Sequence, residues 1–308
     1  MRIAAMAAGA VGGYFGARMQ AAGHEVFYIA RGAHLDAIRK NGLTIESVHG
    51  NLHLPKVNVT DNPADVGPVD IVLFAVKLWD TETAAAAARP LIGPETRLIT
   101  FQNGVDSVER ISAVLGAERT IGGVAYIATV IASPGVIKHT SSFAMMRFGR
   151  ADRRPDQKLA AFADAGKAAK LDIDISPDVE RELWQKFIFL TAMAGATAGL
   201  RSAIGPIRDD PELRGFFRQL MQEAFAVGKA KGVALDPAYI EERMDFLMHK
   251  VEPGMKASMA HDLERGNRLE LDWLNGKVRA LGRELGIATP ASDAVYTVLK
   301  LHRMGEHR

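Results

Sequence analysis

The chain has 308 residues, of which 48% are apolar and 24% are charged. This is an ordinary globular composition and more chain than one hydrophobic core usually holds, so we expect two domains. The net charge of +2, with acids and bases interspersed, indicates no basic face dense enough to neutralise a run of phosphates, which argues against a nucleic-acid partner. Cysteine is absent, which excludes disulfides, thiolate nucleophiles and cysteine-ligated metals.

No segment predicts a membrane span. The uncharged stretch of residues 187–200 is 14 residues long and suits a buried helix better than a bilayer-spanning one. The apolar N-terminus is interrupted by Gly9, Gly12 and Gly13, so we interpret it as a strand and not as a signal peptide. We therefore expect a cytoplasmic protein with no membrane partner and no metal.

The first 120 residues alternate short β-rich runs with helical stretches. We expect strands at residues 2–6, 25–29, 69–76 and 97–101, and helices at residues 11–22, 34–41, 81–88 and 105–115. This alternation predicts an α/β domain of the Rossmann type, with a doubly wound parallel sheet. Residues 121–149 read as extended segments around Pro134-Gly135 without a helix, which predicts an antiparallel edge.

The second half of the chain is almost entirely helical in pattern. We place the boundary at Ser176-Pro177, with the serine as helix cap and the proline at the first helical position. The predicted domains are therefore a Rossmann domain, residues 1–176, and an all-helical domain, residues 177–308. Helix breaks are expected near residues 201–211, 232–237, 251–254 and 286–290. One apolar helical face is predicted by the spacing of Leu271, Leu274, Val278, Leu281 and Leu285.

A glycine-rich turn follows the first expected strand. Ala7 replaces the first glycine of a GxGxxG dinucleotide-binding fingerprint, while Gly9 and Gly12 keep the second and third positions. These two glycines let the backbone approach a pyrophosphate and let the helix pack closely on the strand. Ala10 and Val11 open the helix, whose first N–H groups are unpaired and carry partial positive charge. The strand–turn–helix context predicts dinucleotide binding by residues 9–12, with simple packing as the alternative.

The end of the second expected strand indicates which dinucleotide is bound. NAD enzymes normally place an acid there, against the ribose 2′-hydroxyl. This chain instead has Arg31, whose guanidinium suits a 2′-phosphate, so we expect NADP(H). A solvated loop arginine is the alternative.

Residues 9–16 and 30–32 resemble the N-terminal signature of ketopantoate reductases, also called 2-dehydropantoate 2-reductases. Later landmarks agree in order: Val76-Lys77, Gln102-Asn103-Gly104, Trp184-Gln185-Lys186, Ser258-Met259, Glu270-Leu271-Asp272, Asn275-Gly276, and Gly286-Ile287 to Pro290. The resemblance spans about residues 1–300. It implies an active site in the cleft between a Rossmann and a helical domain, and NADPH-dependent reduction of a 2-oxo acid, by default ketopantoate to pantoate.

The resemblance also implies roles for five residues. Lys186 matches the proton donor, since an ammonium can stabilise an alkoxide and protonate it; a stem reaching for solvent is the alternative. Asn103 matches a residue on the nicotinamide side, although Asn-Gly is also an ordinary turn. Lys77 resembles a lysine near the cofactor, with a plain solvated lysine as the alternative. Ser258 matches a serine that contacts the substrate, with a surface hydroxyl as the alternative. Glu270 matches a glutamate that contacts the cofactor, with an acid that favours the positive end of a helix as the alternative.

Two positions depart from the family pattern. Typical members carry asparagines four and eight residues after the catalytic lysine, on one helix face, where this chain has Leu190 and Ala194. Losing amides that pair with a polar substrate group lowers selectivity for that group. A less polar ketone or imine substrate therefore stays open, as does a non-catalytic NADPH-binding sensor. Thr191 and Thr197 are candidates to replace the amides. The sequence leaves the oligomeric state open, a homodimer included.

Overall fold

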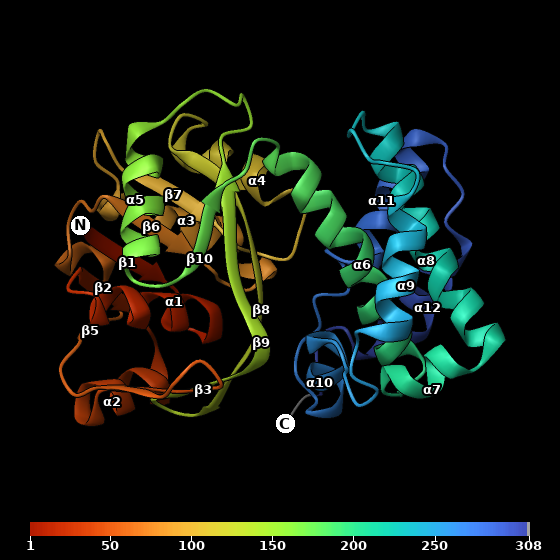
Figure 1. Ribbon diagram of the computed structural model, residues 1–308, viewed down its shortest axis with the longest axis horizontal. Helices are drawn as coiled ribbons and strands as arrows, with labels where there is room; N and C mark the ends of the chain where they lie inside the picture. The colour runs from red at the N-terminus through yellow and green to blue at the C-terminus, as the bar shows by residue number, and fades with distance from the viewer. Residues whose placement is uncertain (307–308) are drawn as a thin grey trace. The chain divides into compact units, whose positions relative to one another are not determined.

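The computed structural model describes residues 1–306 and divides into two compact units (Figure 1). The first unit comprises Met1–Gln102 and Asp106–Val179, and the second comprises Asn103–Val105 and Glu180–Arg308. The first is an α/β unit around one sheet and the second is helical, which confirms the predicted fold class. The functional division at residue 176 stays a prediction.

The first unit contains a single mixed sheet. Its strands are β1 (Arg2–Met6), β2 (Glu25–Ile29), β3 (Leu43–Ser47), β4 (Leu52–Leu54), β5 (Asn58–Thr60), β6 (Ile71–Phe74), β7 (Arg97–Thr100), β8 (Thr120–Ser133), β9 (Val136–Gly149) and β10 (Asp172–Ile175). The order is β4-β3-β9-β8-β7-β6-β1-β2-β5, and β10 also pairs with β9. From β5 to β8 every pairing is parallel. The strand order reverses at β1, which makes the carboxyl end of β1 the expected ligand-binding position of this sheet.

Helices cover the sheet in the first unit and make up the second unit. In the first they are α1 (Ala10–Ala21), α2 (Gly32–Asn41), α3 (Thr81–Ala87), α4 (Ser107–Leu115) and α5 (Gln157–Ala168). In the second they are α6 (Val179–Gly199), α7 (Ile204–Asp209), α8 (Pro211–Ala230), α9 (Tyr239–His249), α10 (Ser258–Glu264), α11 (Asn275–Leu285) and α12 (Pro290–Leu299). Short 3-10 turns occupy Pro63–Asp65, Leu78–Asp80, Arg89–Leu91 and Lys300–His302. Within residues 1–306, no helix has the length and apolar content needed to cross a membrane.

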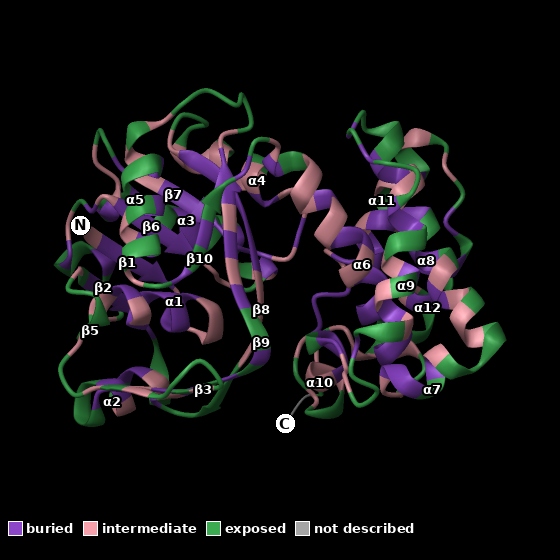
Figure 2. Cartoon of the chain, in the orientation of Figure 1, coloured by how far each residue is buried: buried purple, intermediate pink, exposed green. Residues whose placement is uncertain are grey.

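Strand alternation places one core on each face of the sheet. On β1, Ile3 and Ala5 belong to the core that includes side chains of α1, α2 and α5. Ala4 and Met6 belong to the opposite core, with side chains of α3 and α4. Because successive side chains of a strand point to opposite faces, a strand buried on both sides reads as a continuous apolar run. Figure 2 shows this burial along the central strands.

The antiparallel pair predicted for residues 121–149 is present, but it is not an edge. β8 and β9 pair antiparallel. On its other side β9 pairs in parallel with β3 over Val136 to His139 and with β10 over Met145 to Phe148. Since β9 is 14 residues long, two short strands fit one after the other along it. The expectation of an edge was therefore wrong.

The helix predicted to begin at Ser176-Pro177 begins at Val179 instead. The backbone N–H of Ser176 donates to the carbonyl of Phe148 at 2.8 Å, which continues the ladder between β10 and β9. The serine hydroxyl accepts from the N–H of Asp178 at 3.2 Å, in the turn before α6. Ser176 therefore directly follows β10 and is not the residue that precedes α6, so the predicted helix cap was wrong.

The apolar face predicted for Leu271 to Leu285 is buried, but only part of it is helical. α11 begins at Asn275, so Leu271 and Leu274 lie in the turn that precedes it. Both are buried in the core of the second unit together with Val278. The spacing therefore identified the buried side of this segment and placed the start of the helix too early.

Candidate active site

The turn after β1 presents unpaired backbone amides. Gly9 caps α1 without a side-chain hydrogen bond, and among residues 1–306 its own N–H has no acceptor. A Cβ at Gly9 would meet no atom within 4 Å, whereas one at Gly12 would overlap the carbonyl oxygen of Ala7. The backbone of Ala7 does not enter the positive-φ region that favours glycine. The turn thus has open space at Gly9, tight packing at Gly12, and the positive end of a helix beside both.

Arg31 follows β2 and caps the N-terminus of α2. Its side chain is exposed, and among the residues that the structure describes its guanidinium has no hydrogen-bond or ion-pair partner. An arginine whose five N–H donors have no protein partner can bind a phosphate by donating two parallel hydrogen bonds to it.

A lysine, an asparagine and a glutamate come together in the second unit. The Nζ of Lys186, on α6, donates to the Oδ1 of Asn103 at 2.9 Å. Burial lowers the pKa of Lys186 to about 8, while the carboxylate of Glu270 acts in the opposite direction and raises it. Glu270 is itself buried, in the loop before α11. An ammonium held in this way is a donor whose pKa lies near physiological pH.

The position of this lysine is fixed by its neighbours on α6. Trp184 is buried against α8, where a Cβ at Gly228 would come within 2.8 Å of the indole. The hydroxyl of Tyr239 donates to the carbonyl of Gln185 at 2.5 Å. Both contacts hold the helical turn that presents Lys186.

Comparisons with known proteins agree with these features. Two family models match the chain: "Ketopantoate reductase PanE/ApbA" over residues 3–153 and "Ketopantoate reductase PanE/ApbA C terminal" over residues 178–303. The chain belongs to the ketopantoate reductase family. It is accordingly an oxidoreductase that uses a pyridine nucleotide.

Individual relatives cover nearly the whole chain. The chain is 30% identical over 302 residues to an uncharacterised oxidoreductase of Bacillus subtilis, with 98% of this chain and 99% of the relative covered. It is 30% identical over 321 residues to a 2-dehydropantoate 2-reductase of Mesorhizobium japonicum, covering 97% of each. A crystal structure of a ketopantoate reductase from Ralstonia eutropha aligns with a TM-score of 0.90 at 32% identity, covering 98% of each chain.

The two departures from the ketopantoate reductase pattern differ in their surroundings. Leu190, one helical turn after Lys186, is partly buried at the margin of the core, whereas Ala194 is fully inside it. The hydroxyl of Thr191 donates to the carbonyl of Phe187 at 2.9 Å, so its proton is used in a hydrogen bond within its own helix.

Thr197 likewise donates to the carbonyl of Met193 at 2.6 Å, and it accepts from the N–H of Ala257 at 3.2 Å. Both threonines are buried. Both hydroxyls thus take part in hydrogen bonds within the second unit.

Ser258 and Lys77 are exposed. Ser258 is the first residue of α10. Lys77 follows β6, and its ammonium lies 5.5 Å from the centroid of the Trp79 ring. The structure places each at the start of a helical turn.

Gln102 is a buried residue to which the sequence analysis gave no role. Its amide donates to the carbonyl of Val76 at 3.1 Å and to the hydroxyl of Thr81 at 2.9 Å, and its oxygen accepts from Thr100 at 3.2 Å. Its hydrogen bonds therefore connect the segment that follows β6 with the segment that follows β7. In the sequence, the only signal for this residue was an amide side chain directly after an expected strand. The tertiary contacts show which segments it connects.

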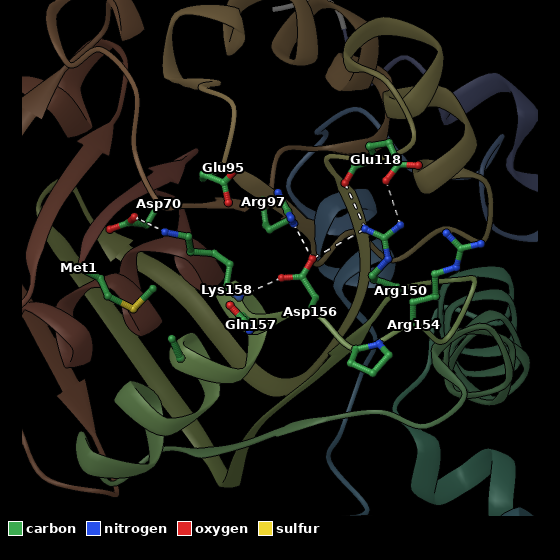
Figure 3. Close-up of a pocket in the computed structure, with 12 residues that line it drawn as sticks. Met1, Asp70, Glu95, Arg97, Glu118, Arg150, Arg154, Asp156, Gln157 and Lys158 are labelled. Carbon is green, nitrogen blue, oxygen red and sulfur yellow. Dashed lines mark hydrogen bonds and ion pairs between the residues drawn. The ribbon is translucent and has the colours of Figure 1, made fainter.

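A hollow of about 690 Å³ in the first unit is a different feature (Figure 3). Its charged side chains pair with one another: Arg97 with Asp156 at 2.6 Å, and Lys158 with Asp70 at 2.8 Å. Arg97 starts β7 and Asp70 directly precedes β6, so the hollow lies at the amino ends of these strands. Ligands of such sheets bind at the carboxyl ends, and we assign the hollow a structural role. Within residues 1–306, no three His, Asp or Glu side chains are arranged to hold a metal.

Proposed function

We propose that the chain reduces a 2-oxo acid with NADPH, and that ketopantoate is the first substrate to test. The observation that carries the proposal is the half-buried Lys186, whose ammonium donates to Asn103 and whose pKa the carboxylate of Glu270 raises against the effect of burial. Carbonyl reduction needs a positive charge beside the oxygen that becomes an alkoxide, together with an acid that protonates it. One ammonium with a pKa of about 8 meets both requirements near neutral pH.

In this mechanism the ammonium of Lys186 donates a hydrogen bond to the C2 carbonyl oxygen of the substrate. The hydride that reaches C2 would come from a bound reduced nicotinamide, which would thereby be oxidised. As negative charge develops on the oxygen, the lysine stabilises it and transfers its proton, which leaves a 2-hydroxy acid and a neutral amine. Asn103 orients the lysine before the reaction, because its Oδ1 accepts a hydrogen bond from the ammonium. Ser258 is proposed to orient the acid.

The cofactor proposal rests on the first unit. The N–H groups of residues 9–12 and the open space at Gly9 suit a pyrophosphate. The uncommitted guanidinium of Arg31 suits a 2′-phosphate and favours NADPH over NADH. We also retain Lys77 and Glu270 as cofactor-contacting residues.

Leu190 supports a second candidate substrate within the same chemistry. It stands one turn from Lys186, where the resemblance implies an amide, and the hydroxyls of Thr191 and Thr197 donate to carbonyls of their own helix. A less polar 2-oxo acid would lose nothing at this position, whereas a polar substituent would lose a hydrogen bond.

The test is to incubate purified protein with NADPH and a panel of 2-oxo acids that includes ketopantoate and apolar branched analogues. We expect cofactor oxidation with at least one acid. Higher kcat/KM for the apolar analogues would favour the second candidate, and Leu190→Asn should then shift the preference toward ketopantoate. Tight NADPH binding with no turnover on any carbonyl compound would support a sensor and contradict the proposal.

A further inference from the structure

The imidazole of His34 connects three segments of the first unit. His34 lies in the first turn of α2 and is half-buried. Its Nε2 lies 3.0 Å from the carbonyl oxygen of Ala8, in the turn after β1. Its Nδ1 lies 3.0 Å from the backbone nitrogen of Gly135, in the turn between β8 and β9.

The chemistry of the two partners fixes the state of the ring. The backbone nitrogen of Gly135 can only donate, so Nδ1 must be the unprotonated nitrogen that accepts. The carbonyl of Ala8 can only accept, so Nε2 carries the proton and donates. His34 is therefore a neutral imidazole of defined tautomer, and burial, which lowers its pKa, favours the same state.

Holding the carbonyl of Ala8 also orients the amide that follows it. In a planar trans peptide the C=O and the next N–H point in opposite directions. A donor bound to the Ala8 oxygen thus aims the N–H of Gly9 away from His34. That N–H has no acceptor among residues 1–306, and the space beside Gly9 is open.

The ring is supported from its other side by a constrained turn. Gly135 has a φ of +80°, and its carbonyl accepts from the N–H of Thr44, on β3, at 2.9 Å. A Cβ at Gly135 would lie 3.3 Å from that of Ala37, on α2. The turn that binds Nδ1 is therefore packed against both α2 and β3 and can hold the imidazole in one orientation.

We propose that His34 is a positioning residue that pre-orients the Gly9 amide for the pyrophosphate of the dinucleotide. This inference rests on the proposed function, since it needs a dinucleotide bound at the turn. His34 acts through the peptide between Ala8 and Gly9, whose carbonyl oxygen its imidazole holds. Its loss should weaken cofactor binding and leave the chemical step unchanged.

Three substitutions separate the two hydrogen bonds. His34→Gln places a donor near the position of Nε2 and retains the bond to Ala8. His34→Asn retains an acceptor near the position of Nδ1 for Gly135 but does not reach Ala8. His34→Leu removes both bonds. His139→Leu is the matched control, because His139 is a buried imidazole on β9 that bonds Ser47 and Phe143 and makes no hydrogen bond to residues 7–9.

The measurements are the NADPH Kd from nucleotide fluorescence, the KM for NADPH, kcat at saturation, and Tm. We expect the Leu and Asn variants to raise Kd and KM for NADPH by about five- to tenfold, the cost of one positioning hydrogen bond. We expect kcat and the KM of the 2-oxo acid to stay unchanged, and the Gln variant to bind NADPH within about twofold of wild type. His139→Leu should lower Tm without changing Kd.

The outcomes distinguish this inference from the function on which it rests. If wild type binds neither NADPH nor NADH, the proposed function is wrong and the inference fails with it. If wild type binds and turns over while His34→Leu binds NADPH equally well, only the role of His34 is refuted. A Gln variant as weak as the Leu variant, at equal Tm, would also refute it.

Discussion

Burial lowers the pKa of Lys186 to about 8, and the Glu270 carboxylate limits that decrease. The lysine donates a proton only in its ammonium form, so kcat/KM for reduction should fall as pH rises through about 8. Oxidation of the 2-hydroxy acid needs the neutral amine and should improve over the same range. Glu270→Gln removes the charge that raises this pKa and should move both limbs to lower pH. If the pH at which kcat/KM for reduction falls is the same in the variant as in wild type, the electrostatic interaction between Glu270 and Lys186 is contradicted.

Substitution of Lys186 itself tests its role in the reaction. Lys186→Ala removes a charge and an acid that act chiefly in the transition state, and we expect kcat to fall by at least about 100-fold. Lys186→Arg should rescue poorly, because a guanidinium hardly releases a proton near neutral pH. Steady-state kinetics and NADPH titration give the measurement. An alanine variant with near wild-type kcat would refute the role, and one that merely unfolds would indicate a structural lysine.

Arg31 decides the nucleotide in our proposal. Arg31→Ala removes a guanidinium that has no partner within residues 1–306, so the folded state should lose little stability. NADPH binding should weaken by about 1.5–3 kcal/mol, and NADH binding should stay nearly unchanged. Calorimetric titration of both nucleotides into wild type and variant measures this. Equal wild-type affinity for NADH and NADPH would overturn the assignment.

The element formed by β1, its turn and α1 offers a matched pair of substitutions. Gly9 has extended backbone angles, and a Cβ there meets nothing, so Gly9→Ala should keep wild-type stability within about 0.5 kcal/mol. The added methyl occupies the approach to the turn, and the Kd for NADPH should rise at least about tenfold. At Gly12 a Cβ overlaps the Ala7 carbonyl, so Gly12→Ala should cost about 1–3 kcal/mol of folding free energy. Urea unfolding and NADPH titration separate the two effects, and the reverse pattern would contradict this description of the turn.

For the molecule as a whole, NADPH should act as a folding ligand. Binding only to the folded chain at 100 times its Kd adds about 2.7 kcal/mol and should raise Tm by roughly 5 °C. NADH at the same concentration should raise Tm less, because it lacks the 2′-phosphate. The control is Gly9→Ala, whose Tm without cofactor should equal that of wild type and respond weakly to NADPH. Equal shifts with both nucleotides in wild type would count against NADP specificity.

The sequence alone was sufficient where the physical signal is local. Alternating strands and helices predicted the central sheet, because each element there is long, periodic and bounded by turn residues. The segments that it left unassigned are β3, β4, β5, α5 and β10. These four strands are only three to five residues long. β3 and β10 pair with β9, β5 pairs with β2, and β4 pairs with β3, so most of them depend on a partner far along the chain. Such pairing is a tertiary property that a window of sequence does not contain.

The candidate site divides in the same way. The glycine turn, Arg31 and Lys186 were identifiable from residue type, order and resemblance. The hydrogen bond between Lys186 and Asn103 joins residues 83 positions apart, and the lowered lysine pKa depends on the burial that folding creates. The two hydrogen bonds of His34 likewise join it to residues 26 and 101 positions away. Thr191 and Thr197 donate to carbonyls four residues back, but their burial depends on the packing of the second unit. The sequence determined which chemical groups are available. The tertiary structure decided which of these groups form internal hydrogen bonds and which remain accessible to a ligand, because desolvation and partner geometry exist only in the folded chain.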